Sequence, residues 1–153
     1  MKKVLLFLAA ILIANVTFAQ WQEPHYYPAD ELKGEAAYWA NQYISDAGYF
    51  VSWSNETDIK IGTRGGIFDY DDHYVTVIIG FYVGDNLEEK VTTKFYVPSG
   101  DSDTAYTSKY RDPKDLGEKI INHLKTKGKV RFIASKYSGA DFDLTVPMNK
   151  NLK

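Results

Sequence analysis

The chain has 153 residues, a formal net charge of −2, no cysteine and 15% aromatic residues, and twelve of its residues are tyrosines. The absence of cysteine excludes disulfides, thiol catalysis and cysteine-based metal sites. No basic patch suggests nucleic acid or an anionic membrane as a partner, and the tyrosines favour β-structure with half-buried aromatic faces.

Residues 1–19 are predicted to be a secretory signal peptide. Two lysines precede an apolar run at 4–13, and a small-residue pattern ends at Ala19, after which cleavage is expected. The run is shorter than the roughly 20 residues of a membrane-spanning helix, so no membrane span is expected after cleavage. The remaining single domain, 20–153, loses two lysines and no acid, which changes the formal charge to −4. We expect a periplasmic or secreted protein, and the lack of disulfides favours a bacterial periplasm.

The N-terminal part of this domain is predicted to be an extended lead-in followed by a helix. Residues 20–28 contain prolines and aromatic side chains, which favour extended backbone. From residue 29 onward, apolar residues recur at three- and four-residue spacings, acids occupy the first turn, and Gly48 follows the last apolar position. The spacing predicts a helix over 29–47.

From Tyr49 the apolar residues alternate, which predicts strands. Two hairpins are expected, one around a turn at 54–57 and one around Asp71-Asp72. Residues 73–83 are apolar on both faces, as expected of a central strand. The predicted strands cover 49–53, 58–62, 66–70, 73–83 and 90–98, with a short strand near 105–109.

The C-terminal part of the sequence predicts a second helix and a final hairpin. Asp112 is a candidate N-cap, an apolar stripe continues to Leu124, and Gly128 is placed just past the helix end. Two alternating strands follow, and the last six residues are expected to fray. The predicted fold is α+β: a mostly antiparallel β-sheet with an N-terminal helix and a second helix before the final hairpin. The competing fold is a two-sheet β-sandwich with a crossing helix.

The acid-rich stretch at 69–73 is predicted to be a turn. Asp71 and Asp72 suit a two-residue hairpin loop, because aspartate tolerates left-handed backbone and bonds to nearby amides. A calcium site is the alternative, and it requires Asp101 and Asp103 from a second loop to meet the first pair, since Ca²⁺ takes six to eight oxygen ligands. The spacing lacks the calcium-loop pattern, and no other cofactor is indicated.

Aromatic residues are the remaining candidates for a binding site. Trp21, Tyr26 and Tyr27 precede the predicted first helix, in a segment with little apolar patterning. They either pack as a cover over the sheet or form, with Tyr82 or Tyr96, a stacking platform. Such a platform would suit a glycan, a peptide or a protein ligand.

The sequence contains no recognisable catalytic motif. Neither His-Glu-x-x-His nor Gly-x-Ser-x-Gly occurs. The leading hypothesis is an exported, non-catalytic binding or interaction domain. The alternative is a metal-dependent or carboxylate-based hydrolase that uses the acidic loops 69–72 and 101–103. A third possibility is self-association through an exposed edge strand.

Overall fold

The computed structural model describes residues 19–32, 34, 36–54, 58–63, 66–100, 102–107 and 115–153, without the side chains of residues 54 and 58. The predicted signal peptide up to residue 18, Asp101 and the predicted helix cap at Asp112 lie outside the described residues. Within those residues, no helix has the length and apolar character needed to cross a bilayer.

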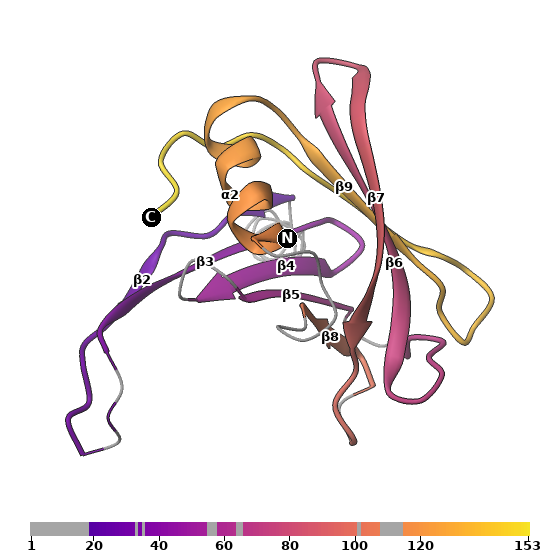
Figure 1. The fold of residues 1–153 in the computed structure, drawn as a ribbon, viewed down its shortest axis with the longest axis horizontal. Coiled ribbons are helices and arrows are strands. Elements are labelled where there is room, and N and C mark those ends of the chain that lie inside the picture. The colour runs from indigo at the N-terminus through magenta and orange to yellow at the C-terminus, as the bar shows by residue number, and fades with distance from the viewer. Residues whose placement is uncertain are drawn as a thin grey trace, which may run out of the picture.

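The described residues form one antiparallel sheet and one helix, α2 (Figure 1). The sheet order is β1-β3-β4-β5-β8-β7-β6-β9-β10, and β2 also pairs with β3. The sheet curls into a half-barrel, and α2 lies on its concave side. The elements are β1 (Gln20–Trp21), β2 (His25–Tyr27), β3 (Tyr38–Ile44), β4 (Tyr49–Ser54), β5 (Asp58–Thr63), β6 (Tyr74–Val83), β7 (Asn86–Tyr96), β8 (Thr104–Tyr106), α2 (Leu116–Thr126), β9 (Val130–Ala134) and β10 (Phe142–Val146).

The predicted α+β fold with two helices is wrong, and so is the alternative two-sheet sandwich. α2 is the single helix among the described residues, and the segment 29–47 contains strand β3 where a helix was predicted. β3 pairs with β4 along one edge and with β1 and β2 along the other. Helix propensity is a weak tendency that such tertiary pairing overrides. Asn41 and Tyr43, two residues apart, are both buried, which is the period of a strand.

Three predicted features of the sheet are confirmed. β4 and β5 form the expected hairpin, β6 is central between β7 and β9, and β9 and β10 form the final hairpin. The buried rows of that hairpin face each other in register: Phe142 with Ala134, Leu144 with Phe132 and Val146 with Val130. The apolar alternation specifies this register, because a one-residue slip would turn one whole row to solvent.

The core fills the concave side of the sheet. Alternate residues of the long strands point inward, and α2 adds Leu116, Ile120 and Leu124. Strands far apart in the sheet order meet there, since the rings of Tyr49 on β4 and Phe142 on β10 have centroids 4.8 Å apart. Apolar packing of the described residues thus fills the concave face, and the outward-pointing side chains of the strands lie on the convex face.

The last residues are anchored to the body, so the prediction that they fray is wrong. Leu152 is buried, and the Asn149 N–H donates to the main-chain O of Leu124. Asn41 on β3 is 2% exposed. Its Nδ2 donates to the main-chain O of Lys153 at 3.0 Å, and its Oδ1 accepts from the Lys153 N–H at 3.2 Å. The C-terminal segment therefore covers the inner face of β3.

Asp143 on β10 forms a two-pronged ion pair with Arg131 on β9, with N–O distances of 2.8 and 2.5 Å. Hydrogen bonds from Arg131 hold the pKa of Asp143 below its ordinary value. Such a group stabilises the fold above its unfolded pKa of about 3.9 and loses that contribution as pH falls through the lowered folded pKa. Both side chains are more than 40% exposed, so the contribution is below about 1 kcal/mol.

We therefore expect Asp143→Asn to lower the free energy of unfolding at pH 7 by less than about 1 kcal/mol. The difference from the wild type should be smaller at pH 2, because the contribution of Asp143 is lost as pH falls through its lowered folded pKa. Denaturant unfolding of both proteins at the two pH values measures this. A difference in the free energy of unfolding that is as large at low pH as at pH 7 would mean that Asp143 acts through packing and not through charge.

Candidate functional site

Three tyrosines form a row across the convex face of the sheet, and we call Tyr74, Tyr96 and Tyr106 the tyrosine row. Tyr74 on β6 lies opposite Tyr96 on β7, which in turn lies opposite Tyr106 on β8. Residues opposite each other share a face of the sheet, and the neighbours Val75 and Phe95 are buried on the other face. Neighbouring strands lie about 4.8 Å apart, so the row spans roughly 10 Å.

Further rings extend the tyrosine row at its β6 end. Tyr74 and Tyr96 meet edge to face with centroids 5.8 Å apart, and the His73 ring lies 6.2 Å from that of Tyr96. Tyr70 stacks beside His73 at 6.3 Å. Tyr96 is 39% exposed and Tyr70 is 40% exposed. This end of the row therefore presents a contiguous aromatic surface to solvent.

The turn that places His73 beside Tyr96 differs by one residue from the predicted turn. Asp71 pairs with Tyr74 through reciprocal N–H···O bonds of 3.0 and 2.9 Å, so the loop residues are Asp72 and His73 and not Asp71-Asp72. Both loop residues have positive φ, 49° and 64°. A two-residue hairpin turn of type I′ needs positive φ at both positions, and aspartate and histidine tolerate it better than most residues. Phe68 bridges Lys136 and does not pair with β6.

Lys60 occupies the other end of the tyrosine row. It lies opposite Tyr106 on the neighbouring strand, and its Nζ is 5.2 Å from the Tyr106 ring centroid and 5.8 Å from that of Phe50. Phe50 lies across Gly62, where a Cβ atom would fall 2.3 Å from the ring. The glycine therefore lets the Phe50 ring lie flat on the sheet, and the lysine ammonium contacts two rings.

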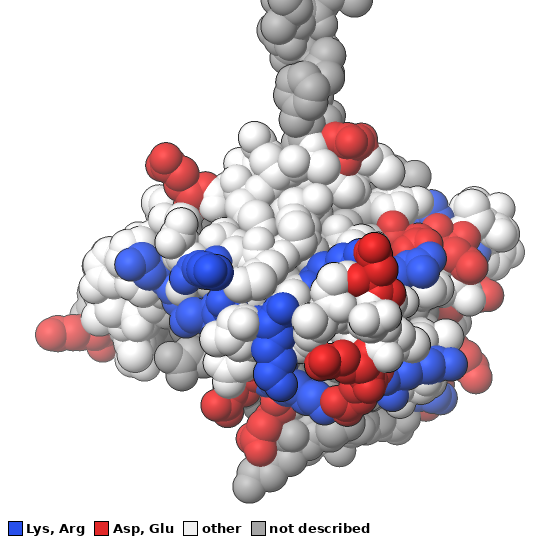
Figure 2. Space-filling model, turned by 90° about the horizontal axis from the view of Figure 1, so that it is seen from above, with Lys and Arg blue, Asp and Glu red and all other residues white. Residues whose placement is uncertain are grey.

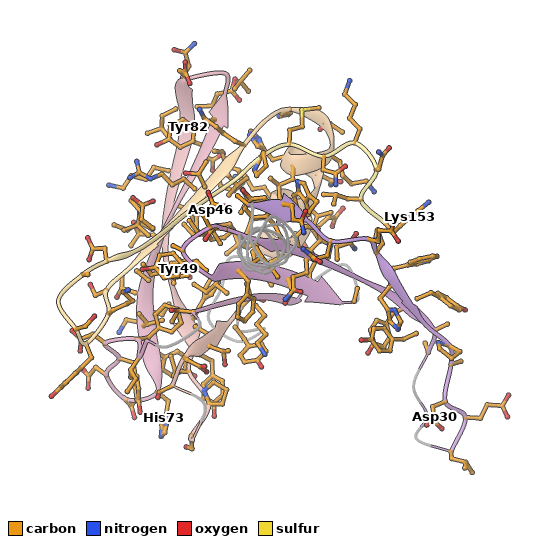
Figure 3. All side chains as sticks on the ribbon, turned by 180° about the vertical axis from the view of Figure 1, so that it is seen from behind. Asp30, Asp46, Tyr49, His73, Tyr82 and Lys153 are labelled. Carbon is orange, nitrogen blue, oxygen red and sulfur yellow. The ribbon has the colours of Figure 1, made fainter. Side chains whose placement is uncertain are left out.

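The structure separates Tyr82 from Tyr96, the two tyrosines predicted on this face. Tyr82 pairs with Leu87 near the β6–β7 turn, whereas Tyr96 pairs with Tyr74 at the opposite end. Eight residues of β6 separate the two positions, which corresponds to about 26 Å at 3.3 Å per residue. Figure 3 shows Tyr82 and His73 at opposite ends of the same ribbon. Of the two, only Tyr96 belongs to the tyrosine row.

The N-terminal aromatic residues lie elsewhere. Trp21 packs on the core, with its ring 5.3 Å from that of Tyr43, and its Nε1 donates to the main-chain O of Pro147. Tyr26 and Tyr27 lie on β2, which with the start of β3 forms an arm that extends from the body (Figure 1). Tyr27 stacks on Tyr38 of that arm at 4.8 Å. These three residues therefore do not join the tyrosine row.

The acidic loops approach each other through their main chains. The Phe68 N–H donates to Ser102 O, and the Thr63 N–H donates to Asp103 O. Within the described part of the chain, no three histidine or carboxylate side chains gather as metal ligands would. Asp71 and Asp72 are exposed near the hairpin turn, and Asp101 lies outside the described residues.

A hollow of about 390 Å³ lies between the β6–β7 hairpin and α2. Two of its charged residues bind each other: Lys119 pairs with Glu89 and also lies over the Phe81 ring. His123, 6% exposed, donates from Nε2 to Tyr82 O at 2.9 Å. Figure 2 looks onto this end and shows acidic and basic side chains next to one another in the middle and on the right of the view. The hollow is therefore a less favourable ligand site than the convex face.

The sequence alone did not single out Tyr74, Tyr106 or Lys60. Their alternation with buried neighbours is visible in the sequence and assigns each to an outer face. What joins them is the order of strands, because β8 lies between β5 and β7 although it follows both in the chain. A pairing between strands that are far apart in the chain cannot be recognised from the local pattern of residues in the sequence.

Comparison with family models, with curated proteins and with solved structures gave no match to this chain.

Proposed function

We propose that this chain is an exported, non-catalytic domain that binds a glycan on the tyrosine row. The observation that supports this most directly is the alignment of Tyr74, Tyr96 and Tyr106 opposite one another on the convex face. Side chains on paired strands have little freedom to move, so the rings are held ready before a ligand arrives. Preorganisation of this kind lowers the entropic cost of binding.

A glycan suits this surface better than a peptide. Pyranose rings have apolar C–H faces and a rim of hydroxyl groups, and tyrosine combines an apolar ring with a hydroxyl that donates and accepts hydrogen bonds. Polar residues Thr92 and Lys94 lie on the same face of β7 as Tyr96. A bound peptide most often adds a strand at a sheet edge or enters a groove, and the tyrosine row is in the interior of the sheet.

The test is binding of the purified protein to a panel of soluble polysaccharides, measured by affinity electrophoresis and then by calorimetry. Tyr96→Ala should weaken binding about tenfold or more, as expected for loss of a central aromatic contact. Tyr137→Ala is the matched control, because Tyr137 is 81% exposed and lies outside the row. Its affinity should equal that of the wild type.

Two results would contradict the proposal. One is the absence of binding to any glycan in the panel. The other is an equal loss of glycan affinity in the Tyr96→Ala and Tyr137→Ala variants. Thermal unfolding of each variant separates loss of the surface from loss of the fold, and Tyr96→Ala should melt near the wild type because the removed ring lies on the outer face.

A further inference from the structure

Lys60 has aromatic side chains as its partners, as Lys136 over Tyr49 and Lys153 over Trp39 also do, but Lys60 alone of these three lies beside the tyrosine row. Lys119 pairs with Glu89, Lys129 with Asp85, and Arg131 with Asp143. Among the described side chains, no carboxylate lies within ion-pair distance of Lys60. Its ammonium contacts the rings of Tyr106 and Phe50. A cation held over ring faces still has N–H groups to share, since the ammonium carries three donors.

The position of Lys60 links this charge to the tyrosine row. Lys60 is directly opposite Tyr106 on the adjacent strand, so a sugar ring stacked on Tyr106 brings its substituents next to the ammonium. Lys94 adds a second positive charge on the same face, two residues from Tyr96 along β7. One positive charge therefore lies at the Lys60 end of the row and another lies beside its middle tyrosine, although the chain as a whole is acidic.

Two exposed acids lie at the other end of the row. Asp71 and Asp72 flank the turn beside His73 and are exposed. A negatively charged ligand is repelled at the turn and attracted at Lys60, so the charges favour one orientation of the ligand along the row. Charge arrangements of this kind select partners and their orientation more than they raise affinity.

We infer that the ligand of the tyrosine row is an acidic polysaccharide, whose uronate carboxylate bonds to the Lys60 ammonium while its sugar ring lies on Tyr106. This inference rests on the proposed glycan-binding function. A carboxylate accepts from an ammonium in a charge-assisted hydrogen bond, which is about twice as strong as a neutral one. The Phe50 and Tyr106 rings hold the ammonium in place and exclude water from one side of it.

The experiment compares oligogalacturonate and oligomannuronate with their carboxyl-reduced forms, which keep the sugar rings and lose the charge. Calorimetry should show that the wild type binds at least one acidic oligosaccharide about tenfold more tightly than its reduced form. Lys60→Met keeps a side chain of similar length over the two rings and removes the charge. It should bring the affinities for the acidic and the reduced form to within about twofold of each other. Lys60→Arg should retain the preference.

The outcomes separate this inference from the function on which it rests. Equal affinity of the wild type for acidic and reduced forms, or a preference that survives in Lys60→Met, overturns the role of Lys60. Glycan binding that is still sensitive to Tyr96→Ala would leave the proposed function standing. Failure of every oligosaccharide, charged or reduced, to bind the wild type would overturn both.

Discussion

Replacing Gly128 with alanine is expected to destabilise the fold by about 3 kcal/mol, the upper end of the usual cost of overpacking. A Cβ atom at this position would lie 2.0 Å from the main-chain O of Tyr82, and 3.3 Å from the Cα of Val83. Both obstacles are backbone atoms of β6. The loss should appear as a lower midpoint with an unchanged slope in denaturant unfolding.

The main chain at Tyr82 has little room to give way. Its carbonyl accepts from His123 Nε2 at 2.9 Å, and its N–H donates to the main-chain O of Lys129 at 3.0 Å. Moving this strand away from the new methyl group would stretch both bonds. Alanine also restricts the unfolded chain, which offsets less than about 1 kcal/mol of the loss.

Gly139→Asn is the matched control for Gly128→Ala. Gly139 has φ of +79° and no atom within 4 Å of an added Cβ, and asparagine accepts left-handed backbone more readily than most residues. We expect its effect to be small. Similar losses in the two variants would mean that the cost at Gly128 does not come from its close approach to β6.

At Gly128 the sequence predicted the correct position for the end of the helix, but the reason a glycine is needed there is a different one. The pattern predicted that a helix ends before this glycine, and α2 does end at Thr126. A helix-ending glycine usually adopts positive φ, but Gly128 does not. A glycine is required here because strand β6, more than forty residues earlier in the chain, passes close to it. No local sequence pattern reveals this contact.

The predictions that succeeded are those that depend on alternation within short hairpins. The facing rows of β9 and β10 follow from apolar spacing, because the two strands are close in sequence and one slip would expose a whole row. The turn at Asp72-His73 was misplaced by one residue, because aspartate suits positive φ at either candidate position. Local chemistry located the turn, but the prediction of a hairpin there is wrong, because residues 66–70 form no strand and β6 pairs with β7 and β9.

A binding site made of aromatic residues stays a prediction, and of the aromatic residues named from the sequence only Tyr96 lies in the tyrosine row. Tyr96 was placed correctly on the outer face of its strand, and its partners were not identified. The tyrosine row depends on β8 lying between β5 and β7, and such pairings over long sequence separation cannot be read from periodicity. The same limit applies to β3, whose spacing fits a helix and whose pairing partners make it a strand.

Asn41 distinguishes the strand from the predicted helix in a single experiment, and Asn41→Asp is the second substitution expected to have a large effect. In a helix over 29–47, Asn41 lies off the apolar stripe, so a carboxylate there would cost little. In the sheet, Asn41 is 2% exposed, and its Nδ2 donates to Lys153 O. Aspartate cannot make that bond when ionised. We expect the free energy of unfolding at pH 7 to fall by about 3 kcal/mol, since an unsatisfied buried polar group costs about 1–3 and a charged one more.

Gln42→Glu is the control, because it adds the same charge at the adjacent position on the opposite face of β3. Gln42 is half-buried and faces outward, opposite Ser52, so we expect a loss below about 0.5 kcal/mol. Burial should raise the pKa of the introduced aspartate, so its destabilising effect should shrink as pH falls through that raised folded pKa and a protonated carboxyl can again donate. Equal effects of the two substitutions at pH 7 would contradict the strand and favour the helix. A large loss in Asn41→Asp that diminishes at low pH would place the Lys153 segment on the inner face of β3, where it closes one end of the core.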